Sequence, residues 1–84
     1  MEDLTKLPNI GDNLAHQLAE VGISTSEELK QLGSKEAWLR IKNIDSSACI
    51  NRLYALEGAI ENIPKKLLND DIKTDLKEFY NCYK

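Results

Sequence analysis

The stretch that decides the fold is Leu7-Pro8-Asn9-Ile10-Gly11, because it describes a tight turn directly before a helix. Apolar residues then recur at helical spacing, at Leu14, Leu18 and Val21. Gly22 follows them, and glycine is the residue that most often ends a helix in the left-handed conformation. Because the residue before a proline is pushed out of the α region, a first helical turn over residues 1–6 must end there. The sequence therefore predicts a helix-hairpin-helix-like unit.

In such a unit the loop amides and the positive N-terminal end of the second helix can form an anion site. Its usual ligand is a nucleic-acid phosphate, and the candidate contacts here are Lys6, Asn9, Ile10, Gly11 and Asn13. The charge opposes this interpretation, since Asp12 lies in the loop and residues 1–33 carry six acidic side chains against two basic ones. The alternative is purely structural: Pro8 and Gly11 shape the turn while Ile10 fills the core. The acidic surroundings favour the structural interpretation.

Length and composition predict one soluble, folded domain. The chain has 84 residues, of which 42% are hydrophobic and 30% charged, so it can fold around one core and is not disordered. A net charge of -3 argues against bulk attraction to nucleic acid or to an anionic membrane. No apolar run approaches the roughly 20 residues that span a bilayer, and the N-terminus does not resemble a signal peptide. We expect a cytoplasmic protein that does not contact the membrane.

Every periodic segment has the helical period, so the fold class is all-α. Thr25 and Glu28 have the spacing of a capping box that starts a helix ending at Gly33. Ser34 is expected to cap a fourth helix over residues 35–42. The next helix, the longest, is expected to be capped by Asp45 or Ser46 and to continue to about residue 62. Asn69 is expected to cap the last helix.

The longest of these helices is predicted to form the centre of the core. Its apolar residues recur at spacings of three and four, at Cys49, Leu53, Leu56, Ile60 and Ile63. Gly58 inside this helix costs about 1 kcal/mol relative to alanine, which indicates that another backbone passes close to it. Cys49 and Cys82 have neither metal-ligand nor redox spacing, so both are expected to act as small hydrophobic residues.

Four segments occur in the order and spacing of a known family. They are Leu7-Pro8-Asn9-Ile10-Gly11, Val21-Gly22-Ile23-Ser24-Thr25 with Glu27-Glu28-Leu29, Gly33-Ser34-Lys35-Glu36-Ala37-Trp38-Leu39, and Leu53-Tyr54-Ala55-Leu56-Glu57-Gly58-Ala59-Ile60. Over about residues 4–80 the chain resembles the C-terminal domain of the TfoX/Sxy competence regulators. The resemblance implies a compact bundle of about five helices with a helix-hairpin-helix-like (SAM-like) unit, and no catalysis. TfoX-like regulators carry a separate N-terminal domain and act with a cyclic-AMP receptor transcription factor on DNA-uptake genes.

The residues themselves also predict no enzyme, cofactor or metal site. His16 is the sole histidine and lies on the polar side of its helix, with no Ser or Cys positioned by sequence for activation. The acidic pairs at 27–28 and 70–71 each begin a helix, where they interact favourably with the helix dipole. We therefore expect residues 1–84 to form a single stand-alone, non-enzymatic domain.

A local basic patch is the second candidate for a nucleic-acid contact. Lys35, Arg40 and Lys42 share one short helix with Trp38, and in the sequence only Glu36 opposes them. Basic side chains beside an aromatic ring can hold a backbone and stack a base. The alternative makes Trp38 a core residue and the charges a solvated face. The pair at residues 65–66 could extend the patch, but the sequence does not place it.

The last helix carries an apolar stripe that needs a partner. It contains Ile72, Leu76, Phe79, Tyr80 and Tyr83. The chain is small, and tyrosines beside a phenylalanine are typical of interfaces, so the last four of these residues are candidates for self-association as a weak homodimer. The function favoured by the sequence is a protein-binding or self-associating regulatory domain. The alternative is a weak, sequence-nonspecific DNA-binding accessory protein that uses the hairpin loop or the helix over residues 35–42.

Overall fold

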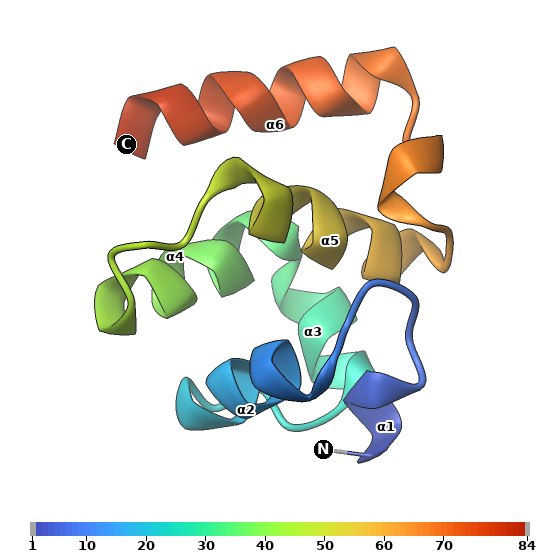
Figure 1. Cartoon of the computed structure of the whole chain (residues 1–84), viewed down its shortest axis with the longest axis vertical. Coiled ribbons are helices and arrows are strands. Elements are labelled where there is room, and N and C mark those ends of the chain that lie inside the picture. The colour runs from blue at the N-terminus through green and yellow to red at the C-terminus, as the bar shows by residue number, and fades with distance from the viewer. Residues whose placement is uncertain (1, 84) are drawn as a thin grey trace.

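The computed structural model describes residues 2–83, and all regular structure in that range is helical (Figure 1). The elements are α1 (Glu2–Thr5), α2 (Asp12–Glu20), α3 (Ser26–Leu32), α4 (Ser34–Ile44), α5 (Ile50–Glu61), the 3-10 turn η1 (Lys65–Leu67) and α6 (Asp70–Tyr83). The all-α prediction is confirmed. α1 is a single turn, so the first helix of the expected helical pair is much shorter than the second.

Helix α5 runs through the middle of the molecule. In Figure 1, α6 lies along one side of it, while α1 and α2 lie on the other side. α4 packs against α5, and α3 contacts both of them. The hairpin loop between α1 and α2 rises toward the end of α5, so segments far apart in the sequence meet there (Figure 1). α5 is the central core helix that its apolar stripe predicts, but the prediction that it is the longest helix is wrong, since α6 has 14 residues and α5 has 12.

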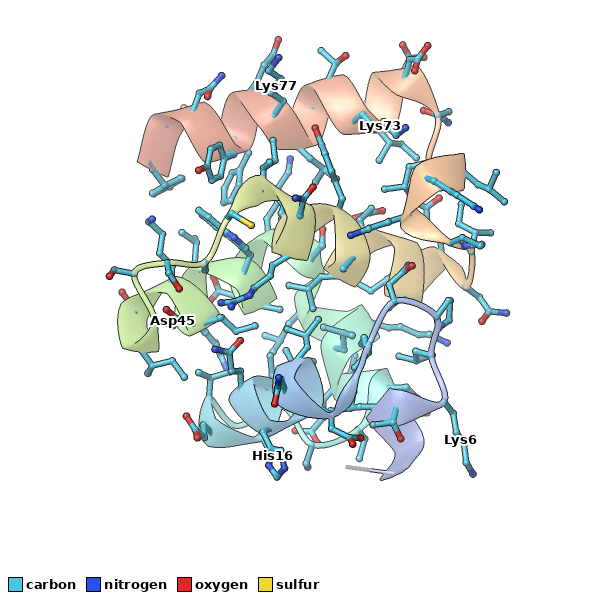
Figure 2. All side chains as sticks on the ribbon, in the orientation of Figure 1. Lys6, His16, Asp45, Lys73 and Lys77 are labelled. Atoms are coloured by element: carbon cyan, nitrogen blue, oxygen red, sulfur yellow. The ribbon has the colours of Figure 1, made fainter. Side chains whose placement is uncertain are left out.

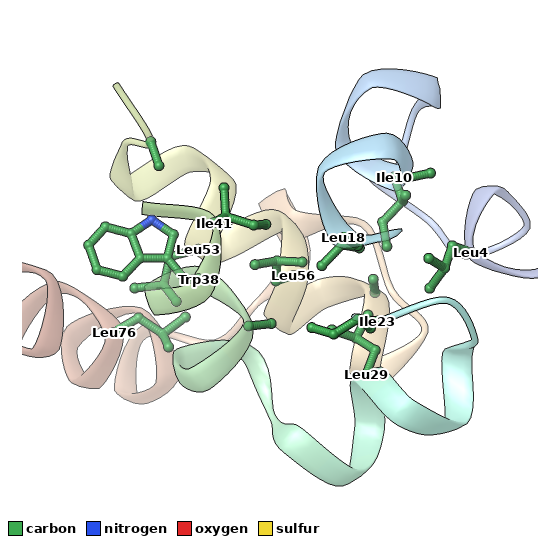
Figure 3. Packing of buried hydrophobic residues seen from close by; sticks show 14 of the residues in the cluster. Leu4, Ile10, Leu18, Ile23, Leu29, Trp38, Ile41, Leu53, Leu56 and Leu76 are labelled. Atoms are coloured by element: carbon green, nitrogen blue, oxygen red, sulfur yellow. The ribbon is translucent and has the colours of Figure 1, made fainter. Parts of the chain in front are cut away.

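The buried core has an aromatic and an aliphatic half that meet at Leu56 of α5 (Figure 3). On one side lie Trp38, Ile41, Leu53 and Leu76, and on the other lie Leu4, Ile10, Leu18, Ile23 and Leu29. Trp38 is fully buried, which confirms its assignment to the core. The core therefore connects the hairpin side of the molecule to the α6 side through α5.

Several predicted helix ends are confirmed. The Glu28 amide donates to Thr25 Oγ1 at 3.1 Å, which caps α3. The Glu28 carboxylate accepts in turn from the Thr25 hydroxyl at 3.2 Å. Gly22 follows α2 with φ +89°. The Ile72 amide donates to Asn69 Oδ1 at 2.8 Å, so Asn69 caps α6. These ends depend on contacts within three residues, which is why local sequence predicts them.

Two predicted caps are wrong, and so is the role given to the cysteines. Gly33, not Ser34, occupies the N-cap of α4; Ser34 is 4% exposed and its hydroxyl donates to Glu57 Oε1 of α5 at 2.6 Å. Helix α5 begins at Ile50 with Cys49 at its N-cap, so neither Asp45 nor Ser46 caps it. Both Cys49 and Cys82 are free and exposed rather than packed as small hydrophobic residues. Contacts with other elements account for the two caps, since Ser34 donates to Glu57 of α5 and Asp45 accepts from Gln17 of α2 and Arg52 of α5.

Candidate functional site

The hairpin loop is tied to the segment after α5 by one side chain. Asn9 has a left-handed backbone, with φ +71°. Its Nδ2 donates to the Ile63 carbonyl at 3.0 Å, and its Oδ1 accepts from the Lys65 amide at 3.0 Å. We call this pair of hydrogen bonds the Asn9 clasp. Both the nitrogen and the oxygen of the Asn9 side chain are thus bonded within the domain, so this side chain stabilises the fold.

Gly58 makes room for the clasp. A Cβ added at this position would lie 2.5 Å from Asn9 Nδ2 and 2.8 Å from the Ile63 carbonyl oxygen. Real Cβ atoms do not approach other atoms so closely, so a side chain at Gly58 would displace the clasp. The predicted close approach of a second backbone to Gly58 is confirmed.

The rest of the hairpin loop divides between the core and the surface. Ile10 is 6% exposed and belongs to the core cluster, as the structural interpretation of the loop expects. A hollow of about 470 Å³ lies beside the loop, lined by Gly11, Asp12, Asn13, Leu14, Gln17 and Arg52. Lys6 is exposed and points away from the body of the molecule (Figure 2), and it does not line this hollow. The structure thus brings Gly11 and Asn13 together and leaves Lys6 apart.

Arg52 of α5 is the basic residue at the loop that sequence reasoning missed. Its Nη1 lies 2.8 Å from Asp45 Oδ2, which also accepts from Gln17 Nε2 at 2.8 Å. Hydrogen bonds from Ser47 and from Arg52 hold the pKa of the Asp45 carboxyl well below its usual range. Arg52 is thus held by the Asp45 carboxylate. It comes from α5, so no sequence pattern near the loop predicts that it lies beside the loop.

The predicted basic patch does not form one surface. Lys35 Nζ lies 2.7 Å from Asp75 Oδ2 of α6, so Glu36 is not the sole acid that opposes the patch. Lys42 Nζ lies over the Trp38 ring, 5.3 Å from its centroid. Lys35 and Lys42 are seven residues apart and share one face of α4, the face toward α6.

Arg40 lies on another side of the same helix. Its Nη1 donates to the Val21 carbonyl at 3.4 Å, and its Nε lies 3.8 Å from Glu36 Oε1. Arg40 therefore belongs with the end of α2 and not with Lys35 and Lys42. The lysines at 65 and 66 lie in η1, which packs on α5, and in Figure 1 η1 is on the side opposite the end of α4.

The α6 stripe is mostly used inside the domain. Leu76 is 2% exposed, so it belongs to the core and not to a self-association surface. Phe79 and Tyr80 are half-buried and meet Trp38 edge-on, at centroid distances of 6.0 and 5.6 Å. Tyr83 is 48% exposed and lies 4.9 Å from the Phe79 ring. The aromatic group thus runs from the core to the surface and ends at Tyr83.

A second hollow, the α6 groove, lies between the first half of α6 and the α3–α4 junction. It measures about 460 Å³ and is lined by Leu32, Gly33, Ser34, Lys35, Glu57, Asp71, Ile72, Asp75 and Leu76. Its carboxylates are Glu57, Asp71 and Asp75, and Lys35 is its one cation. Beside it, a hydrogen bond with Glu57 raises the pKa of the Glu61 carboxyl. Sequence reasoning did not anticipate this groove.

Two features are absent between residue 2 and residue 83, a metal-binding cluster and a membrane-spanning helix. In that range, His, Cys, Asp and Glu side chains nowhere gather in threes with the placement that a metal ion requires. None of the helices there combines the length and the apolar character needed to cross a membrane. His16 is exposed and points into solvent (Figure 2).

Comparison with known proteins gives one consistent result. The chain is 37% identical to Protein Sxy of Escherichia coli (strain K12) over 78 residues, which cover 93% of this chain and 37% of Sxy. It thus spans little more than a third of that relative. An uncharacterized protein from Listeria monocytogenes, crystallised in a triclinic form, superimposes with a TM-score of 0.93 at 49% identity, covering 94% of this chain and 90% of that one.

A second Listeria monocytogenes structure, in a tetragonal form, agrees with the first. It gives a TM-score of 0.92 at 48% identity over 95% of this chain and 99% of that one. The model of the TfoX C-terminal domain matches residues 1–80, nearly the whole chain. The match, the Sxy relative and the ordered segments in the sequence agree, and the chain belongs to the TfoX C-terminal domain family.

Proposed function

We propose that the chain is a non-enzymatic regulatory domain that acts by binding another protein. Its relationship to Sxy supports a domain of the competence-regulator type. The observation that carries the proposal is the aromatic group of Trp38, Phe79, Tyr80 and Tyr83, which begins in the core and ends on the surface. We place the partner contact at its exposed end, the last turns of α6.

Physical properties of these side chains support a protein as the ligand. Tyrosine and tryptophan are enriched at the energetic centres of interfaces, because they bury a large area while ordering few torsions. Phe79 and Tyr80 pack edge-on against Trp38, and the Tyr83 ring packs against Phe79, so the Tyr83 ring is already partly ordered in the folded domain. A side chain that is ordered before binding loses less entropy when a partner covers it.

The test is affinity capture from the native cell, with wild type and Tyr83→Glu as baits and with and without nuclease. We expect a protein that wild type retains after nuclease treatment and that Tyr83→Glu loses. Leu67→Glu is the matched control, because Leu67 is also an exposed apolar residue and lies before the opposite end of α6, about 20 Å away for 14 helical residues. Equal capture by wild type and Tyr83→Glu would contradict the proposed contact.

A second candidate function is weak, sequence-nonspecific DNA binding at the hairpin loop. The observation in its favour is Arg52, which lines the same hollow as Gly11 and Asn13. A cation beside the N-terminus of α2 is a reasonable arrangement for a phosphate. Asp12 lines the hollow too, and Asp45 already pairs with Arg52, so we expect this binding to be weak.

An NMR titration with a short duplex tests the second candidate. With about two to four phosphates neutralised, log affinity should fall against log salt with a slope of about -2 to -4. Asp12→Lys should strengthen binding at the loop, and added DNA should then shift the amide resonances of residues 10–13. Lys35→Glu with Arg40→Glu should abolish DNA binding only if α4 is the contact. In that case DNA should shift wild-type resonances near Trp38. A wild-type spectrum that DNA leaves unchanged at low salt would exclude this function.

A further inference from the structure

The turn η1 carries a strongly exposed apolar residue next to two lysines. Leu67 is 63% exposed, more than any other large hydrophobic side chain that the structure describes. Lys65 and Lys66 precede it, both are exposed, and the ion pairs among the described residues do not include them. The Asn9 clasp holds the Lys65 amide, so the turn is anchored to the rest of the domain. η1 is therefore a fixed protrusion with an apolar tip and two positive charges.

The α6 groove has the complementary chemistry. Leu32, Ile72 and Leu76 contribute apolar surface to it. Of its three carboxylates, Asp75 is paired with Lys35, whereas Glu57 and Asp71 have no cation among the ion pairs of residues 2–83. The groove thus combines an apolar floor with two carboxylates that have no cation partner among the described residues.

From this complementarity we infer that η1 of one copy of the chain docks in the α6 groove of a second copy. Leu67 covers the apolar floor, and the two lysines face Glu57 and Asp71. Within one chain η1 ends four residues before Asp71, so protrusion and groove lie at the same end of α6. A twofold axis at that end places each protrusion opposite the other copy's groove, which is the arrangement of a closed symmetric dimer.

This dimer uses a surface different from the exposed end of the aromatic group, where the partner protein is proposed to bind. The two proposals can therefore fail separately. Three residues of η1 and one groove form a small contact on each side, well below the area of a standard stable interface. We expect a weak dimer that forms at high protein concentration.

Sedimentation equilibrium at up to about millimolar protein measures the dimer directly. Leu67→Glu should raise the dimer dissociation constant about tenfold or more, as for the loss of a central apolar anchor. Tyr83→Glu is the control and should leave it within about twofold. Both residues are exposed, so both variants should keep the wild-type circular dichroism and melting temperature. A wild-type monomer throughout, or a Leu67→Glu dimer of unchanged affinity, would overturn the inference.

Charge exchange between two variants makes the test specific. Lys65→Glu with Lys66→Glu reverses the charge of the protrusion, and Asp71→Lys reverses the charge of one carboxylate position in the groove. Each variant alone should therefore dimerise less than wild type. Their mixture should form a heterodimer, since one of its two contacts is native and the other has exchanged charges. A mixture no more associated than its components would contradict the pairing. A monomeric wild type whose groove binds a Lys-Lys-Leu peptide, and loses it in Asp71→Lys, would assign the groove to another protein.

Discussion

The hairpin side and the α6 side of α5 are built in different ways. On the hairpin side, aliphatic residues from α1, the loop, α2 and α3 meet around Leu18 and Ile23, and the Asn9 clasp ties the loop to the chain after α5. On the α6 side, one helix lies over Trp38, fixed by Leu76, two edge-on aromatic contacts and the Lys35–Asp75 ion pair. An exposed ion pair of this kind contributes little to stability.

The difference indicates which part of the domain can move. The hairpin side is interlocked, because segments far apart in the sequence pack in one hydrophobic cluster and are joined by the Asn9 clasp. Helix α6 is a single element on a single seam, so it can separate at a lower free energy than the whole domain unfolds. The proposed partner contact and the proposed dimer contact both involve the α6 side, while the hairpin side holds the fold together.

The largest effect is expected where the two sides meet. Leu56→Ala should lower the free energy of unfolding by about 3 to 5 kcal/mol, because it removes buried contacts from both halves and leaves a cavity. Urea unfolding followed by circular dichroism measures this loss. Leu67→Ala, at an exposed position, should change stability by no more than about 0.5 kcal/mol. A loss below about 1 kcal/mol for Leu56→Ala would show that α5 is not central.

A matched pair of core substitutions separates the sides. Leu29→Ala and Leu76→Ala remove the same atoms from fully buried positions, and each should cost about 2 to 4 kcal/mol. Hydrogen exchange should then differ. Leu29→Ala should lower protection in α2 and α3, which exchange by global unfolding, and leave that of α6 unchanged, whereas Leu76→Ala should lower protection in α6 as well. If Leu29→Ala lowers protection in α6 as much as in α2, the domain unfolds as one unit and the comparison is wrong.

A substitution at Gly58, on the hairpin side, should have a smaller effect on stability than the core substitutions. Gly58→Ala should cost about 1 to 3 kcal/mol, because its Cβ would overlap the Asn9 amide and the Ile63 carbonyl. Thermal unfolding measures the loss, and faster exchange of the Lys65 amide would identify the clasp as its origin. Gly11→Ser is the control, since a Cβ there meets nothing within 4 Å and serine is a good N-cap residue. A stable Gly58→Ala protein would contradict the close packing.

The smallest effect concerns pH. The folded pKa of Asp45 is lowered by hydrogen bonds from Ser47 and Arg52, so the ionised carboxylate stabilises the fold above the unfolded pKa of about 4. This contribution is lost as the pH falls below about 4 toward the folded pKa. Urea unfolding between about pH 5 and pH 2 should show a steeper loss for wild type than for Asp45→Asn. Equal slopes would mean that the carboxylate does not connect α2 to α5 in solution.

The sequence predicts those parts of the fold that depend on neighbours along the chain. The Thr25 and Asn69 caps, the turn at Gly22 and the apolar stripe of α5 are all readable within a few residues. The burial of Trp38 and the close approach to Gly58 are also predictable, because a large aromatic residue and a glycine inside a helix each imply close packing.

The wrong or missing predictions involve partners on other elements. Ser34 resembles a cap locally but its hydroxyl donates to Glu57, and Asp45 accepts from the side chains of Gln17 and Arg52 instead of capping α5. In the sequence Glu36 is the one acid near Lys35, whereas in the fold α6 also brings Asp75 to it. No local pattern contains these contacts, so neither the split of the basic patch nor the α6 groove could be predicted from the residues that form them.

The Asn9 clasp has a consequence for the order of folding. Its two hydrogen bonds join residues 54 and 56 positions apart, whereas the helices and their caps close within a few residues. Contacts that close so long a loop form late, because the chain loses much entropy before they stabilise it. Asn9→Ala should therefore leave the refolding rate nearly unchanged and speed unfolding. The clasp then acts as a kinetic latch, which sets how long the folded domain persists rather than how quickly it forms.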